Sequence, residues 1–136
     1  MNLDSIEVTI LRNLIFNEEF LRKVVPFMKS EYFENINQKI IFEEVVNFVQ
    51  QYNKPVTKEI LCIEIEKRSD INDSTFQEIT KLISYFEDDK SEFEWLVDTT
   101  EKWCRDRAIY LALMESIQLA DGKDDTKGRD AIPTIL

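Results

Sequence analysis

Paired carboxylates are the groups in this chain whose type and spacing come nearest to chemistry. They occur as Glu18-Glu19, Glu43-Glu44, Asp88-Asp89 and Asp124-Asp125. Two carboxylates can serve as general acid and general base when they converge on a cleft and their pKa values are pushed apart. Residues adjacent on a helix point in different directions. We therefore interpret these pairs as solvated helix faces and predict no catalytic residue among them.

The other residue types exclude most catalytic and metal sites. The sequence has no histidine, the commonest general base and metal ligand, and no Gly-x-x-x-x-Gly-Lys-Ser/Thr loop to hold nucleotide phosphates. Residues 123–130 lack the spacing and final glutamate of a calcium-binding loop. Cys62 and Cys104 form no zinc pattern, and we expect both to be buried, small apolar residues in a reducing compartment. We expect no enzyme activity, cofactor or metal within these residues.

The charge balance limits the partners of the chain. It has 27 acidic and 17 basic residues, for a net charge of −10. Such a surface repels phosphate, so the chain is a poor candidate for wrapping DNA and suits a basic protein partner better. Simple solubility is an equally open explanation of the charge. No apolar run approaches the roughly 20 residues that span a membrane, and Met1–Ser5 lacks the basic start of a secretion signal, so we expect a cytoplasmic protein without a membrane partner.

The elements that must position these side chains are predicted to be helices throughout. Both glycines, Gly122 and Gly128, lie near the C-terminus, and the apolar spacing before them is helical. We expect helices over about residues 4–16, 17–25, 38–52, 57–69, 74–86 and 91–120. Their predicted N-terminal caps are Asp4, Asn17, Thr57, Ser74 and Ser91.

The predicted fold is all-α, a compact five- to six-helix bundle with a long C-terminal helix. We expect residues 1–90 to form the bundle and residues 91–136 to form the long helix and the segment after it. The third helix is apolar over most of its circumference, through to Tyr52, which is typical of a buried centre. The aromatic residues Tyr32 and Phe33, in the turn before it, are predicted to belong to the core.

The long helix is the element with functional content. About 28 residues make a rod of roughly 42 Å. The half from Ala108 to Leu119 is too apolar to stand free in water, so it packs on a returning helix, on another copy, or on the main bundle. Trp95 and Trp103 are either partner contacts or core residues. Arg107 either forms surface ion pairs or contacts a neighbouring subunit. The candidate interface residues are Trp103, Arg107, Tyr110, Leu111, Met114 and Ile117.

Several short motifs occur together in an order typical of one family. They are Ser30-Glu31-Tyr32-Phe33-Glu34, Trp95-Leu96-Val97, Thr100-Glu101-Lys102, Arg107-Ala108 and Ala131-Ile132-Pro133. With these motifs the chain resembles the N-terminal domain of DnaB-type replicative DNA helicases, most closely those of T4-like phages.

The resemblance implies a larger parent protein in the cytoplasm of an infected host. Members of the family are ring-shaped hexamers that hydrolyse nucleoside triphosphate and translocate 5′–3′ on single-stranded DNA. Their ATP or GTP and Mg²⁺ bind in a RecA-like domain, which these residues do not include. Their N-terminal domains form a collar, paired through a helical hairpin, that engages primase and the helicase loader. Ser91–Ala120 looks like the first arm of that hairpin, and Ala131-Ile132-Pro133 looks like the start of the second.

A second function stays open on the sequence alone. The chain is also compatible with a freestanding acidic helical adaptor that binds a host replication or transcription protein. The two hypotheses differ in whether the coding sequence continues into a phosphate-binding loop.

Overall fold

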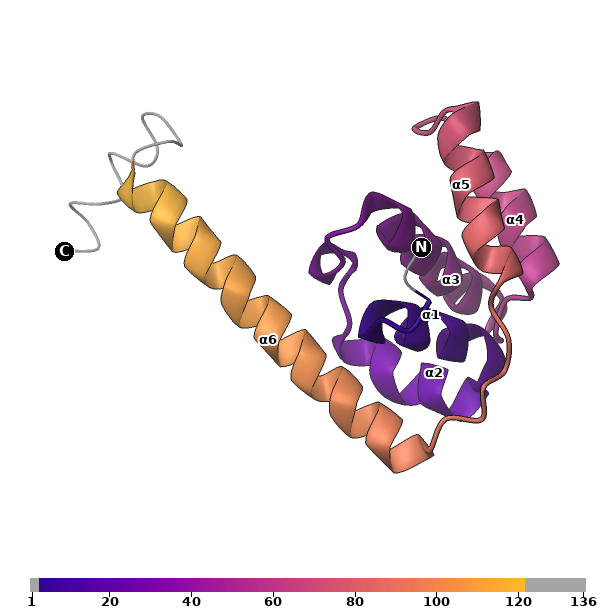
Figure 1. Ribbon diagram of the computed structural model, residues 1–136, viewed down its shortest axis with the longest axis horizontal. Coiled ribbons are helices and arrows are strands. Elements are labelled where there is room, and N and C mark those ends of the chain that lie inside the picture. The colour runs from indigo at the N-terminus through magenta and orange to yellow at the C-terminus, as the bar shows by residue number, and fades with distance from the viewer. Residues whose placement is uncertain (1–2, 122–136) are drawn as a thin grey trace. The chain divides into compact units, whose positions relative to one another are not determined.

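The computed structural model describes residues 3–121, and within that range every regular element is helical. The elements are α1 (Ile6–Phe16), α2 (Glu18–Val24), η1 (Val25–Phe27), η2 (Ser30–Tyr32), α3 (Ile36–Tyr52), α4 (Lys58–Glu66), α5 (Asp73–Ser84) and α6 (Phe93–Ala120) (Figure 1). The predicted all-α fold with a long C-terminal helix is confirmed. Ala131-Ile132-Pro133, the expected start of a second hairpin arm, lies outside the described residues.

The chain divides into two units, residues 1–101 and residues 102–136. The division falls inside α6, which is itself one unbroken helix. The boundary expected from the sequence, after residue 90, stays a prediction.

Helix α3 is the centre of the first unit. It packs against α1, α4, α5 and η2, while α2 packs on α1 and α4 lies beside α5 (Figure 1). Apolar residues spaced three or four apart on each helix turn inward and leave water. The largest fully buried side chains are Ile10, Leu11, Leu14, Phe20, Leu21, Ile41, Leu61, Ile65, Ile79, Ile83, Phe86 and Leu96. Each contributes roughly 1.5–3 kcal/mol when it is removed from water.

The aromatic turn before α3 belongs to this core. Tyr32 and Phe33 are buried, and the Phe33 ring lies 5.3 Å from that of Phe42. Their prediction as core residues is confirmed. Tyr52 was expected to face inward as well, but its side chain is 53% exposed. Its ring lies 4.7 Å from that of Phe48, so one face is covered and the other meets water.

Two predicted helix caps are confirmed. The side chain of Asn17 accepts a hydrogen bond from the backbone N–H of Phe20, and that of Thr57 accepts one from Ile60. In both places one capping residue directly precedes the apolar pattern, so local sequence identifies it. Helix α2 ends at Val24 and a short 3₁₀ turn that contains Pro26 follows, because proline has no N–H to continue the helix.

Three predicted caps are wrong, and each is displaced by one or two residues. Ser5, not Asp4, caps α1 by accepting from the N–H of Val8. Asn72, not Ser74, caps α5 by accepting from Thr75 at 2.8 Å. Several residues able to cap precede these helices, and the one that stands directly before the first helical residue is in reach of the open N–H groups.

The third wrong cap is displaced by one residue, and its cause is local. Ser91 was expected to cap α6, but its hydroxyl donates to Asp89 Oδ1 at 2.7 Å. The carboxylate of Glu92 takes its place and accepts from the N–H groups of Glu94 and Trp95, at 3.2 and 2.7 Å.

Candidate interaction surfaces

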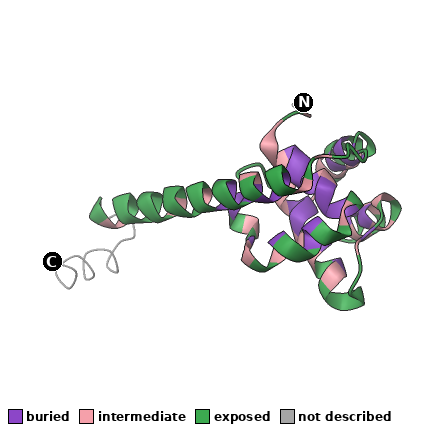
Figure 2. Ribbon diagram, turned by 90° about the horizontal axis from the view of Figure 1, so that it is seen from below, coloured by how far each residue is buried: buried purple, intermediate pink, exposed green. Residues whose placement is uncertain are grey.

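The second half of α6 exposes a continuous apolar face. Ile109, Tyr110, Leu113, Met114 and Ile117 are 54, 44, 58, 37 and 50% exposed. At about 100° per residue, this spacing places all five side chains on one side of the helix, over roughly 140° of its circumference. Figure 2 colours most of this part of α6 as exposed. We call these five residues the α6 apolar face.

The local sequence explains why this segment is a helix. Residues 108–120 contain no glycine or proline and are rich in alanine, leucine and methionine, which favour helices. The hydroxyl of Ser116 donates a hydrogen bond to the backbone carbonyl of Ala112 at 3.0 Å. The polar group of Ser116 is therefore satisfied within the helix itself. The longer polar side chains of Arg107 and Gln118 lie along one edge of this face.

The structure separates the predicted interface residues. Tyr110, Met114 and Ile117 lie on the α6 apolar face, and the guanidinium of Arg107 lies 4.9 Å from the centroid of the Tyr110 ring. Trp103 is only 9% exposed and is buried rather than open. Leu111 is half-buried and, by its helical position, points away from the apolar face. The contact role of these residues stays a prediction.

The predicted set omitted Ile109 and Leu113, which are among the most exposed of the five. The signal that identifies them is their spacing, since residues 109, 113 and 117 are four apart and share one helix face. The sequence prediction followed a spacing of seven, from Trp103 to Tyr110 to Ile117. That spacing does not include Ile109 and Leu113.

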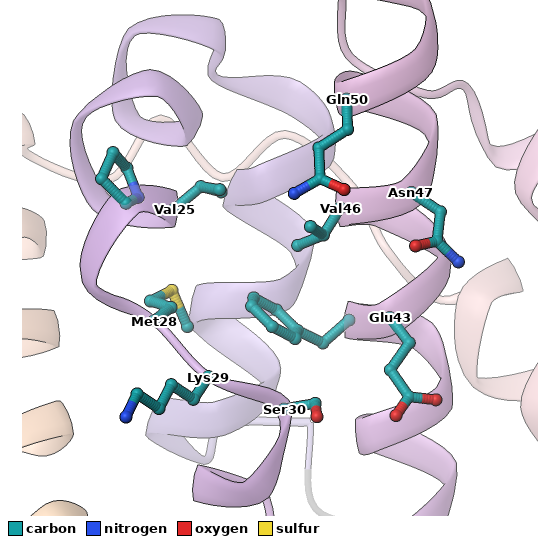
Figure 3. A pocket seen from close by; sticks show the side chains of 10 residues that line it. Val25, Met28, Lys29, Ser30, Glu43, Val46, Asn47 and Gln50 are labelled. Carbon is teal, nitrogen blue, oxygen red and sulfur yellow. The ribbon is translucent and has the colours of Figure 1, made fainter.

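A hollow in the first unit was not anticipated. It has a volume of about 520 Å³ and lies between residues 25–30 and α3 (Figure 3). Val25 and Met28 on one side and Val46 on the other give it apolar walls, and Gln50 places its amide beside them. Lys29, Ser30, Glu43, Asn47 and Gln50 contribute polar or charged side chains to the same hollow, so its lining is mixed.

One pair of adjacent carboxylates is bound to an arginine rather than to solvent alone. Arg68 donates to Glu44 at 2.7 Å and to Glu43 at 3.0 Å, and it also pairs with Asp70 at 2.7 Å. The hydrogen bond to Arg68 lowers the pKa of Asp70. Our interpretation of Glu43-Glu44 as a solvated face is wrong, because this ion-paired cluster ties the α4–α5 connection to α3.

The pair Asp88-Asp89 is also not simply solvated. Asp89 Oδ2 accepts from Arg12 Nε at 2.8 Å, and Asp89 Oδ1 accepts from Ser91. The carboxylate thereby holds the connector between α5 and α6 against α1. Asp124-Asp125 lies outside the described residues.

The cysteines contribute little reactive chemistry. Neither cysteine is part of a disulfide; Cys104 is buried, and Cys62 is half-buried, less than expected. Burial, with the charge of Glu59, raises the pKa of the Cys62 thiol and weakens it as a nucleophile. Residues 3–121 contain no group of three or more histidine, cysteine, aspartate or glutamate side chains able to hold a metal. In the same range no helix has the length and apolar content needed to cross a bilayer.

Comparison with known proteins supplies what the geometry alone does not. No protein-family model matches the chain. The chain is 32% identical over 110 residues to a protein of Enterobacteria phage T4 described as a DnaB-like replicative helicase. The match covers 81% of this chain but only 23% of the T4 protein, so the chain spans about a quarter of the length of that relative. The predicted resemblance is confirmed: most of the chain is similar to a part of the DnaB-like replicative helicase of phage T4.

Proposed function

We propose that the chain is a collar domain of a phage replicative hexameric DNA helicase, acting in the cytoplasm of the infected host. The observation that carries the proposal is the 32% identity to the T4 helicase, which supports a role in DNA replication. In this proposal the domain is not itself catalytic. It organises the subunits and contacts primase or the helicase loader. ATP or GTP, Mg²⁺ and single-stranded DNA are handled by the full-length ring, which unwinds duplex DNA.

The α6 apolar face is the proposed contact between subunits. Its five side chains are about half exposed, so burying them contributes roughly 1 kcal/mol each, or about 10 kcal/mol for two copies. Association costs about 4–15 kcal/mol in lost freedom and ordering. The two terms nearly cancel, so this chain by itself should self-associate weakly. Firm assembly requires the further apolar surface that a second hairpin arm would bring.

Light scattering over a dilution series tests the assembly. We expect a concentration-dependent shift from monomer to dimer in this chain and a larger shift in a longer version that includes the whole hairpin. The double variant Leu113→Glu/Ile117→Glu should abolish the shift, because it places charges on the apolar face. The matched variant Ala108→Glu/Ala112→Glu adds the same charges on the opposite side and should retain it. A strict monomer in both the short and the long versions would refute the proposal.

The coding sequence after residue 136 discriminates the proposal from the freestanding adaptor. The helicase hypothesis requires it to continue into a Gly-Lys-Ser/Thr loop, whereas a stop codon there favours the adaptor. The present chain should show no ATP hydrolysis, and measurable turnover would contradict its role as a non-catalytic collar.

A further inference from the structure

Trp95, near the start of α6, is held facing solvent. Glu92 caps the helix at this point, and Leu96, Val97 and Thr100 occupy its buried side. Because the buried side of α6 is occupied by these residues, Trp95 faces outward, and it is 53% exposed. Its indole makes no hydrogen bond or ring contact within residues 3–121. Tryptophan is highly buried on average, so a tryptophan that is more than half exposed is unusual.

A row of unpaired carboxylates runs beside the indole. Glu94, Asp98 and Glu101 lie at positions i, i+4 and i+7, which share one helix face. All three are exposed, and the ion pairs found among residues 3–121 involve none of them. Glu43, Glu44 and Asp89, in contrast, are each paired with an arginine of the same unit. No ion pair within residues 3–121 therefore neutralises the row, and Lys102, four residues after Asp98, is the basic residue at its edge.

We propose that Trp95 and the row Glu94, Asp98 and Glu101 form a docking site for a basic segment of a protein partner. An arginine of that segment stacks on the indole, and its other basic residues pair with the carboxylates. Arginine fits better than lysine, because its planar guanidinium can stack on an aromatic face and bind a carboxylate with two hydrogen bonds.

The charges on the chain select this occupant over the alternatives. In a symmetric pair about this face, a second copy would bring its own acidic row against the first, and like charges in contact disfavour such a pair. Nucleic acid would bring phosphates to the same carboxylates in a chain of net charge −10. A basic protein segment can both stack an arginine on the Trp95 indole and pair with the three carboxylates. This site differs in chemistry from the α6 apolar face and does not rest on the proposed assembly.

A defined peptide tests the site. The probe is an amidated amphipathic helical peptide of arginine, leucine and alanine, with its arginines three and four residues apart, and a second peptide has lysine at the same positions. We expect the arginine peptide to bind several-fold tighter than the lysine peptide in calorimetry and to change the tryptophan emission. Trp95→Phe, which leaves Trp103 as the only tryptophan, should lose that change in emission.

Matched variants separate this site from general attraction of a cationic peptide to an acidic protein. Trp95→Ala, and the triple variant Glu94→Gln/Asp98→Asn/Glu101→Gln, should each weaken binding about tenfold or more. The triple variant Glu19→Gln/Glu31→Gln/Glu66→Gln removes the same charge from exposed positions elsewhere and should change it little. The proposal fails if the two triple variants weaken binding equally, if Trp95→Ala binds like the wild type, or if neither peptide binds. Far-UV circular dichroism confirms that each variant is folded.

Discussion

Among single residues, Asp89 links the charge of the chain to its stability. Burial of its carboxylate opposes ionisation, but hydrogen bonds from Ser91 and Arg12 prevail and lower the pKa of Asp89. In the unfolded chain an aspartate titrates near about 3.9. Because the folded pKa lies below the unfolded one, ionised Asp89 stabilises the fold above about pH 4. That contribution is lost as the pH falls through the folded pKa.

Replacing this carboxylate should make stability less sensitive to acid. Asp89→Asn is expected to lower the free energy of unfolding by about 1 kcal/mol at pH 7, at the lower end for a charged hydrogen bond because solvent screens part of the side chain. It should also flatten the loss of stability on acidification below about pH 4. Urea unfolding at a series of pH values measures both effects. Asp88→Asn is the control, since that carboxylate bonds only within the connector. An unchanged pH slope in Asp89→Asn would show that the Arg12 contact contributes nothing.

At the scale of elements, the start of each helix depends on one side chain that satisfies its open N–H groups. Asn72 has an extended backbone, with φ −100° and ψ 176°, and its side chain reaches the N–H of Thr75. Ser74, two residues later, already lies inside the first turn of α5. The two residues are close in sequence and both exposed, so they form a natural pair for comparison.

The cap predicts a difference between two neighbouring alanine variants. Asn72→Ala should lower the free energy of unfolding by about 1 kcal/mol, because one N–H of α5 loses its partner. Ser74→Ala should change it by less than about 0.5 kcal/mol. Denaturant unfolding of the two variants beside the wild type decides the point. Equal losses, or a larger loss for Ser74→Ala, would mean that Asn72 is not the cap.

At the scale of the whole molecule, complete burial is concentrated in the first unit. Every residue in the described range that is less than 2% exposed lies within residues 1–101. In helix α6 no residue from Ile109 to Ala120 is buried. An isolated helix of this length is marginal in water, so its backbone hydrogen bonds depend on a partner more than those of α1 or α3 do.

Hydrogen exchange should reveal this contrast. In dilute solution, the backbone amides of residues 109–119 should exchange at least about a hundredfold faster than those of α1 and α3, whose opening requires global unfolding. Raising the protein concentration should slow exchange in α6 and leave α1 unchanged if the chain associates through the α6 apolar face as proposed. Mass spectrometry of peptic peptides at two concentrations measures both. Equal protection of α6 and α1 in the dilute sample would contradict the uneven burial.

The sequence by itself was sufficient for the helices, for two of their caps and for most of the core. Ile10, Leu14, Ile41 and Leu61 face inward because helical spacing is a property of the backbone over a few residues. Asn17 and Thr57 could be identified for the same reason, since a cap and its N–H partner are three residues apart.

Tertiary structure decided which residues of the same type are buried or ion-paired and which stay exposed. Trp95 and Trp103 lie on one helix, yet one is open and the other buried. Glu43 and Glu44 became an ion-paired cluster through Arg68, which lies more than twenty residues away in sequence. Such outcomes depend on which distant residues packing brings together, and helical periodicity holds no information about that. The same separation between local periodicity and distant packing explains why the α6 apolar face could be expected from the sequence, while the hollow beside α3 could not.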